Sequence, residues 1–97
     1  MALNKKLTPL IAGRTIQAQS QQDNLLSLNF TNGSTLKIKT TGQPVVLPPG
    51  RAIKAVRQQA AVMAIDFTDG STAEIHLAEA TSSVMLRDAA GALEYAD

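Results

Sequence analysis

The stretch FTNGST at residues 30–35 recurs, with one change, as FTDGST at residues 67–72. In each copy an alternation of apolar and polar residues leads into an Asn-Gly or Asp-Gly pair and resumes after it. Such a pair between two alternating runs is the strongest short-range hairpin signal, because both of its residues tolerate positive φ. The two stretches therefore predict two β-hairpins and favour an all-β fold.

The similarity extends well beyond the hairpins. When the sequence is shifted by 37 positions, residues 10–38 lie on residues 47–75, and Gly13-Arg14 coincides with Gly50-Arg51. A register of this length indicates an internal repeat, whose two units we place at residues 10–40 and 47–77. Each unit is predicted to be a three-stranded antiparallel meander.

The predicted strands follow the alternation of period two. They are Thr15–Gln19, Leu26–Phe30 and Leu36–Thr40 in the first unit, and Ala52–Gln58, Val62–Phe67 and Thr72–Leu77 in the second. The residues expected to face inward are Ile16, Ala18, Ile53, Ala55, Met63, Ile65, Phe67, Ala73, Ile75 and Leu77, and those expected outward are Asp66, Glu74 and His76. A helix across residues 53–65 competes, since Ala, Arg, Gln and Met are good helix formers. Ser20, Asp23 and Asn24 in the first unit suit a turn and argue against that helix.

The remaining segments complete the predicted architecture. The linker between the units contains Pro44 and a predicted turn at residues 48–50, with residues 45–47 as a short extended piece. Residues 82–97 predict a terminal hairpin around residues 88–91. The chain is thus expected to be a single domain, residues 1–97. About eight strands would close into a small barrel or a two-sheet sandwich, because either arrangement leaves few edges.

Composition limits the chemistry. The 97 residues include no cysteine, one histidine and three aromatic residues, so disulfides and thiol chemistry are excluded. The N-terminal residues lack the apolar run of an export signal, and no stretch approaches a membrane-spanning length. We therefore expect a cytoplasmic protein with no cofactor, no metal site and no membrane association.

Charge is unevenly distributed along the chain. Residues 1–57 hold eight of the nine Lys and Arg residues, whereas residues 58–97 hold seven of the eight acidic residues. Such asymmetry bears on the choice of partner. The charges either pair across neighbouring strands, or they form a basic face for an anionic partner or complementary poles that self-associate.

Six cationic residues are the candidate binding residues, namely Arg14, Arg51, Lys37, Lys39, Lys54 and Arg57. The duplicated arginines could present guanidinium forks to phosphates or carboxylates, or could pair with a carboxylate of the chain itself. The lysines could track a nucleic-acid backbone. The acidic turn at residues 66–71 lacks the remaining ligands of a calcium loop, and the single histidine, His76, is expected on the surface.

No convergent acid, base and nucleophile is found, so we predict a protein without enzymatic activity. The expected function is a protein-interaction or structural module that forms a homodimer or binds another protein. The alternative is a small nucleic-acid-binding β-barrel that uses the basic first half. A third possibility is a small-ligand site between the repeats near Arg14 and Arg51. A small domain with few aromatic residues would gain stability from a second interface, which favours the dimer.

Overall fold

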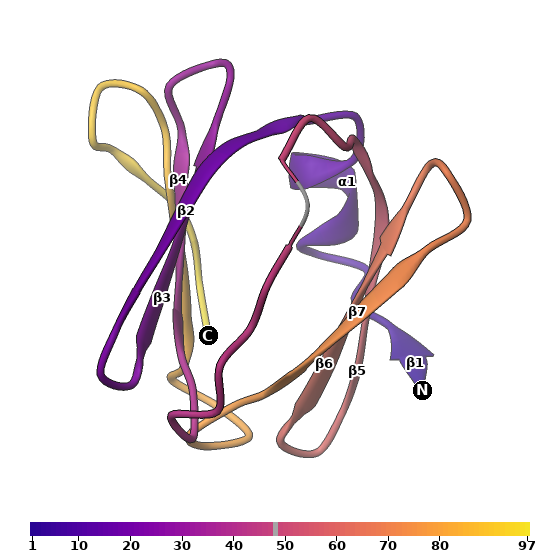
Figure 1. The fold of residues 1–97 in the computed structure, drawn as a ribbon, viewed down its shortest axis with the longest axis vertical. Coiled ribbons are helices and arrows are strands. Elements are labelled where there is room, and N and C mark those ends of the chain that lie inside the picture. Colours follow the sequence, from indigo (N-terminus) through magenta and orange to yellow (C-terminus); the bar gives the residue numbers. More distant parts are fainter. Residues whose placement is uncertain (48) are drawn as a thin grey trace.

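Two antiparallel sheets face each other in the computed structural model, which describes residues 1–47 and 49–97 (Figure 1). One sheet has the strand order β1-β5-β6-β7 and the other the order β2-β3-β4-β8-β9. The elements in chain order are β1 (Ala2–Leu3), α1 (Thr8–Ile11), β2 (Ile16–Gln22), β3 (Leu25–Phe30), β4 (Thr35–Lys39), β5 (Ile53–Gln59), β6 (Val62–Phe67), β7 (Thr72–His76), β8 (Val84–Arg87) and β9 (Leu93–Ala96).

The all-β prediction is confirmed. Strands β2, β3 and β4 form the first predicted meander, β5, β6 and β7 form the second, and β8 and β9 form the terminal hairpin. The competing helix is replaced by β5 and β6. Of the two predicted closures, the sandwich is observed, because the sheets stay separate and meet through the isolated bridges Thr15↔Ala52 and Thr40↔Leu77.

The two meanders are related by an approximate twofold axis that passes through these bridges. At one end Ile16 N–H donates to the Arg51 carbonyl at 3.2 Å, and Ile53 N–H donates to the Arg14 carbonyl at 2.9 Å. At the other end Thr41 N–H donates to the His76 carbonyl at 3.1 Å, and Ala78 N–H donates to the Lys39 carbonyl at 2.9 Å. Each bond becomes its counterpart when 37 is added to the residue number in the first repeat and subtracted from the number in the second. The duplication in the sequence is therefore a duplication in space.

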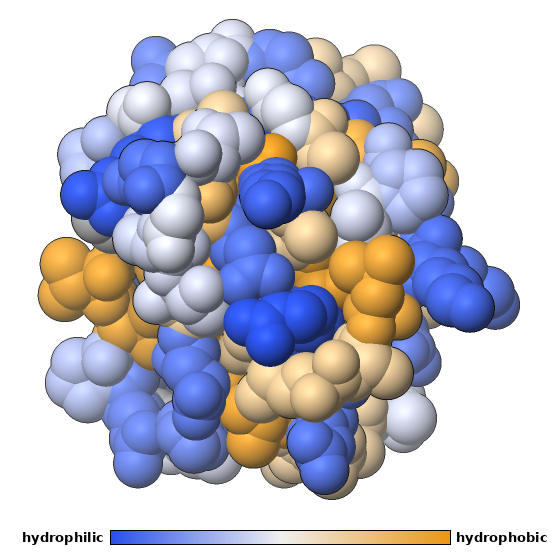
Figure 2. Space-filling model, turned by 90° about the vertical axis from the view of Figure 1, so that its right-hand side faces the viewer, coloured by the Kyte–Doolittle hydropathy of each residue, from blue (hydrophilic) through white to orange (hydrophobic). Residues whose placement is uncertain are grey.

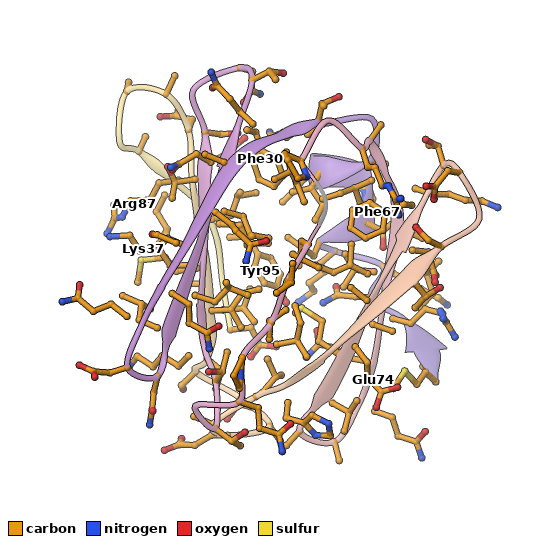
Figure 3. The ribbon with its side chains drawn as sticks, in the orientation of Figure 1. Phe30, Lys37, Phe67, Glu74, Arg87 and Tyr95 are labelled. Carbon is orange, nitrogen blue, oxygen red and sulfur yellow. The ribbon has the colours of Figure 1, made fainter. Side chains whose placement is uncertain are left out.

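The core lies between the sheets. Phe30 and Phe67, which occupy equivalent places in the two repeats, point toward it from opposite sheets (Figure 3). The predicted inward residues Met63, Ile65 and Ile75 are fully buried. Removal of this apolar surface from water is the main term that holds the two sheets together.

The prediction that Ala18 and Ala55 face inward is wrong. Each strand is irregular just before this position, with register shifts between Ile16 and Ala18 and between Ile53 and Ala55. A bulge adds one residue and so reverses the alternation beyond it. Ala18 is consequently exposed, Ala55 is only half-buried, and Val56 takes the buried place in β5.

The hairpin turns also differ from expectation in one detail. In the turns of FTNGST and FTDGST, Gly33 and Gly70 have positive φ, at +89° each, whereas Asn32 and Asp69 before them do not. The Phe30 and Phe67 amides each donate to the backbone carbonyl of the serine four positions later, at 2.9 Å. This pattern is the three-residue loop that places glycine in the left-handed region, not a two-residue turn with positive φ at both positions.

Two segments cover the sides of the sandwich. On one side residues 43–47 run alongside β2, where the side-chain amides of Gln19 and Gln21 bond to the backbone of Gln43, Val45 and Leu47. This confirms the predicted extended piece. On the other side α1 buries Ile11, and the preceding Leu7 is buried with it. The predicted turn at 48–50 begins at Pro48, which lies outside the described residues, and residues 49–50 are in a turn.

The strands outside the repeats are distributed unequally. The terminal hairpin extends the first unit, because β8 pairs with β4. The short β1, which the repeat did not predict, extends the second unit beside β5. The outer edge of β4 is thus covered, whereas its counterpart β7 is the last strand of its sheet. Within the described residues, no helix is long and apolar enough to cross a membrane.

Candidate interaction surface

The duplicated arginines are held by side chains of the chain itself. The two terminal nitrogens of Arg14 donate to the two carboxylate oxygens of Glu94, both at 3.0 Å, and Nη1 also donates to Ser34 Oγ at 3.1 Å. The Arg14 side chain is mostly buried, with 17% of its surface exposed. A bidentate Arg–carboxylate pair is both strong and directional. Arg14 therefore fastens β9 to the β3–β4 turn.

Arg51 makes the same contact to a serine but a different contact to a carboxylate. Its Nη1 donates to Ser71 Oγ at 2.9 Å, as Arg14 does to Ser34, while its Nε lies 3.0 Å from Asp69 Oδ2. Hydrogen bonds from Ser71 are the main cause that lowers the pKa of Asp69. The Arg51 side chain is 39% exposed, more than twice the value for Arg14, because no strand equivalent to β9 covers it.

A third candidate arginine, Arg57, pairs across β5 and β6. Its Nε and Nη2 donate to the two carboxylate oxygens of Asp66 at 2.7 and 2.8 Å, and Thr72 Oγ1 donates to the same carboxylate at 2.7 Å. The hydrogen bond from Arg57 is the main cause that lowers the pKa of Asp66, and the same bond raises the pKa of Arg57. Lys54, which is exposed, lowers the Asp66 pKa further through its charge. This cluster is a cross-strand ion pair of the four-stranded sheet.

Lys37 and Lys39 lie elsewhere, on the outer face of the five-stranded sheet. The pairing of β4 with β8 puts Lys37 opposite Met85 and Thr35 opposite Arg87. Lys37 and Arg87 point away from the core on one side of the molecule, and Glu74 points away from it on the other (Figure 3). Glu74 therefore does not neutralise its repeat counterpart Lys37. The six candidate residues fall into four places and do not form one surface.

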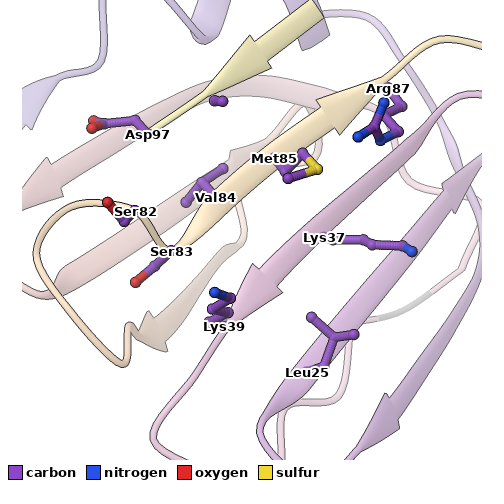
Figure 4. Close-up of a pocket in the computed structure, with 10 residues that line it drawn as sticks. Leu25, Lys37, Lys39, Ser82, Ser83, Val84, Met85, Arg87 and Asp97 are labelled. Atoms are coloured by element: carbon purple, nitrogen blue, oxygen red, sulfur yellow. The ribbon is translucent and has the colours of Figure 1, made fainter. Parts of the chain in front are cut away.

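The face around Lys37 is hollowed into a groove of about 680 Å³ (Figure 4). Its cations are Lys37, Lys39 and Arg87, and its apolar residues include Leu25 and Met85, which are 39% and 37% exposed. The other lining residues are Ser82, Ser83, Val84, Ala96 and Asp97. We call this feature the cationic groove.

The three cations of the cationic groove are not paired within the described residues, where the salt bridges involve Arg14, Arg51, Arg57 and His76. Arg87 Nη1 donates to the Gly91 carbonyl at 2.9 Å, which orients the guanidinium. Asp97 supplies an acidic group at one end of the groove. Arg87 was not among the predicted residues. The alternation of residues 84–87 places it outward, but the pairing of β8 with β4 cannot be derived from that alternation.

The opposite face of the molecule has a different character. On the side of the four-stranded sheet, hydrophobic areas are broken up by hydrophilic ones (Figure 2). His76 and Glu74 lie on this sheet with His76 Nε2 3.9 Å from Glu74 Oε1, and both are exposed. Among the described residues, no group of three or more His, Cys, Asp or Glu side chains is placed to hold a metal ion.

Comparisons with protein-family models, with curated proteins and with solved structures each found no significant match.

Proposed function

We propose that this protein is a protein-interaction module of the cytoplasm whose cationic groove binds an acidic segment of a partner protein, without catalysis. The observation that carries the proposal is that Lys37, Lys39 and Arg87 surround exposed Leu25 and Met85 without carboxylate partners among the described residues. A surface of this composition suits a partner segment in which acidic and apolar side chains alternate.

Charge and apolar area would make different contributions to binding. Exposed cations attract an acidic partner and orient it, but each exposed ion pair stabilises the complex by only about 0.2–1 kcal/mol. Burial of apolar surface adds about 25 cal/mol per Å², so Leu25 and Met85 would supply the affinity that the charges lack. The proposal therefore requires both kinds of contact.

The nucleic-acid alternative relies on the same cations. It receives less support, because three of the six predicted cations are engaged by Glu94, Asp69 and Asp66. The groove also contains no aromatic side chain on which a base could stack. The observations on the groove thus favour a protein segment over a nucleic acid.

A binding assay with two probes separates these functions. The first probe is a fluorescein-labelled peptide of alternating glutamate and leucine, and the second is a labelled single-stranded oligonucleotide. We expect the peptide to bind, and affinity to fall by about tenfold in the double variant Lys37→Glu/Lys39→Glu, as two exposed pairs are replaced by two repulsions. Lys5→Glu/Lys54→Glu, which changes the net charge equally at two exposed lysines outside the cationic groove, is the matched control and should bind as the wild type does.

The outcomes are distinguishable. Binding of the oligonucleotide but not of the peptide would overturn the proposal in favour of the nucleic-acid alternative. Equal loss of affinity in the Lys5→Glu/Lys54→Glu control would show that net charge, and not the cationic groove, drives binding. The predicted homodimer is a separate matter, and light scattering at low and high salt tests it. A monomer under both conditions would exclude it.

A further inference from the structure

We infer that the outer edge of β7 is a second, separate binding site, which accepts an extended segment of a partner protein that carries an acidic residue for Arg51. The inference does not rest on the cationic groove. It rests on what the terminal hairpin does for the first repeat and on what the second repeat lacks.

The terminal hairpin makes two contacts with the first repeat. Strand β8 pairs antiparallel with β4, from Thr35↔Arg87 to Ile38↔Val84. Strand β9 then brings the carboxylate of Glu94 onto the terminal nitrogens of Arg14. Both contacts fall on residues of the first repeat that have counterparts 37 positions later.

In the second repeat the equivalents of β4 and Arg14 are β7 and Arg51, and no hairpin covers either of them. Strand β7 has β6 on one side and no strand on the other within the described chain. Arg51 Nε lies 3.0 Å from Asp69 Oδ2, and the terminal nitrogens of Arg51 donate no hydrogen bond to a carboxylate among the described residues. The edge and the guanidinium that the hairpin covers in one repeat are thus uncovered together in the other.

The backbone of β7 is oriented to accept a strand. The Phe67 amide donates to the Ser71 carbonyl, and the Leu77 amide donates to the Ala61 carbonyl. The backbone groups that face β6 are therefore those of Ser71, Ala73, Ile75 and Leu77. Because hydrogen-bonding direction alternates along a strand, the backbone groups of Thr72, Glu74 and His76 face outward. In the first repeat the equivalent Lys39 amide faces outward and donates to Ser83 at 2.7 Å.

The outer edge of β7 has few of the features that prevent an edge strand from pairing with another chain. It has no proline and no lysine, and Thr41 bonds to it only at its end, through the His76 carbonyl. Added strands of this kind gain affinity from main-chain hydrogen bonds and specificity from alternate side chains. The outward Glu74 favours a basic or neutral residue opposite it, and Arg51 favours an acidic residue near the turn. These two preferences define the chemistry of the partner segment.

The probe for this site is a synthetic peptide of residues 82–97, which contains β8, β9 and Glu94. Titrated into the intact protein, it should bind saturably. The Glu94→Gln form of the peptide should bind about tenfold more weakly, because it cannot form the charged pair with Arg51. The altered residue lies in the peptide, so the fold of the protein is not at issue.

The variant Glu74→Pro identifies the edge that is used. It removes an outward N–H without removing a bond to β6, and proline is tolerated at such edge positions. We expect Glu74→Pro to fold and to abolish peptide binding, whereas Lys37→Pro, the same change on the covered edge, should destabilise the protein. Binding that survives in a folded Glu74→Pro protein, absence of binding to the wild type, or equal binding of the Glu94→Gln peptide would overturn the inference.

Discussion

Leu86→Ala tests whether the terminal hairpin is part of the core. Leu86 is fully buried, opposite Leu36 on β4 and opposite Tyr95 on β9. Neighbours on both sides limit how far the structure can collapse into the space left by Leu86. The free energy of unfolding should therefore fall by about 3 kcal/mol, within the usual range of about 2–5 kcal/mol for Leu→Ala. For a domain of this size that corresponds to a fall in Tm of roughly 12–24 °C.

The assay is urea unfolding followed by two signals. Far-UV circular dichroism reports on all strands, whereas intrinsic fluorescence reports on β9, because Tyr95 is the single tyrosine and there is no tryptophan. If residues 1–97 form a single cooperative domain, both signals should move to lower urea together in Leu86→Ala. Met85→Ala, the next residue but on the outer face, is the control and should change stability by about 0.5 kcal/mol or less.

Two results would refute this reasoning. In the first, the dichroism transition of Leu86→Ala stays at the wild-type urea concentration. In the second, the Tyr95 signal is lost before the dichroism signal in the wild type. Either result would make the hairpin an appendage that unfolds independently of the two repeats.

Three further predictions concern single side chains, and the first two replace a residue of the second repeat by its counterpart in the first. Asp66→Asn should flatten acid unfolding, because Arg57 lowers the Asp66 pKa and the stability so gained is lost as pH falls through that pKa; urea midpoints between about pH 5 and 3 measure it. Ala60 has φ +52°, so Ala60→Asp, the residue found in the first repeat, should stabilise by about 0.5–1 kcal/mol in thermal unfolding. Gln19→Ala should increase proteolytic cleavage within residues 43–47, because it removes bonds of 2.6 Å to both Val45 and Leu47.

The sequence predicts the hairpins well because their determinants are local. The alternation and the Gly of FTNGST and FTDGST act over a few residues, and the repeat supplies an independent second reading. Where local preferences agree with the global fold, secondary structure can be predicted from short stretches of sequence. The strand order within each meander follows from the short turns, which leave antiparallel neighbours as the simplest connection.

The bulges were not predictable from the same pattern. A bulge depends on how a strand bends against its neighbours, and the residues around Gln17 and Lys54 carry no glycine or proline to mark it. The error reversed the expected orientation of Ala18 and Ala55 and hid the inward position of Val56. Because the period of a strand is two, one extra residue is enough to produce this reversal.

The candidate site, like the fold, has features that the sequence predicts and features that it does not. That charges pair within the chain could be stated as an alternative, and the structure confirms it for Arg14, Arg51 and Arg57. The partner of Arg14 could not be named, because Glu94 lies 80 residues away and reaches it only through the β8–β9 hairpin. Arg87 was missed for the same reason, since its place beside Lys37 depends on the pairing of β8 with β4.

Amide hydrogen exchange tests most directly the claim that the two repeats share one scaffold but differ at their outer edges. Lys37 and Lys39 lie on the covered edge, and Glu74 and His76 occupy the equivalent positions on the open one. We predict slow exchange for the two lysine amides, fast exchange for the Glu74 and His76 amides, and slow exchange for the Ile75 amide, which faces β6. Equal protection of the lysine amides and the Glu74 and His76 amides in the isolated protein would contradict it.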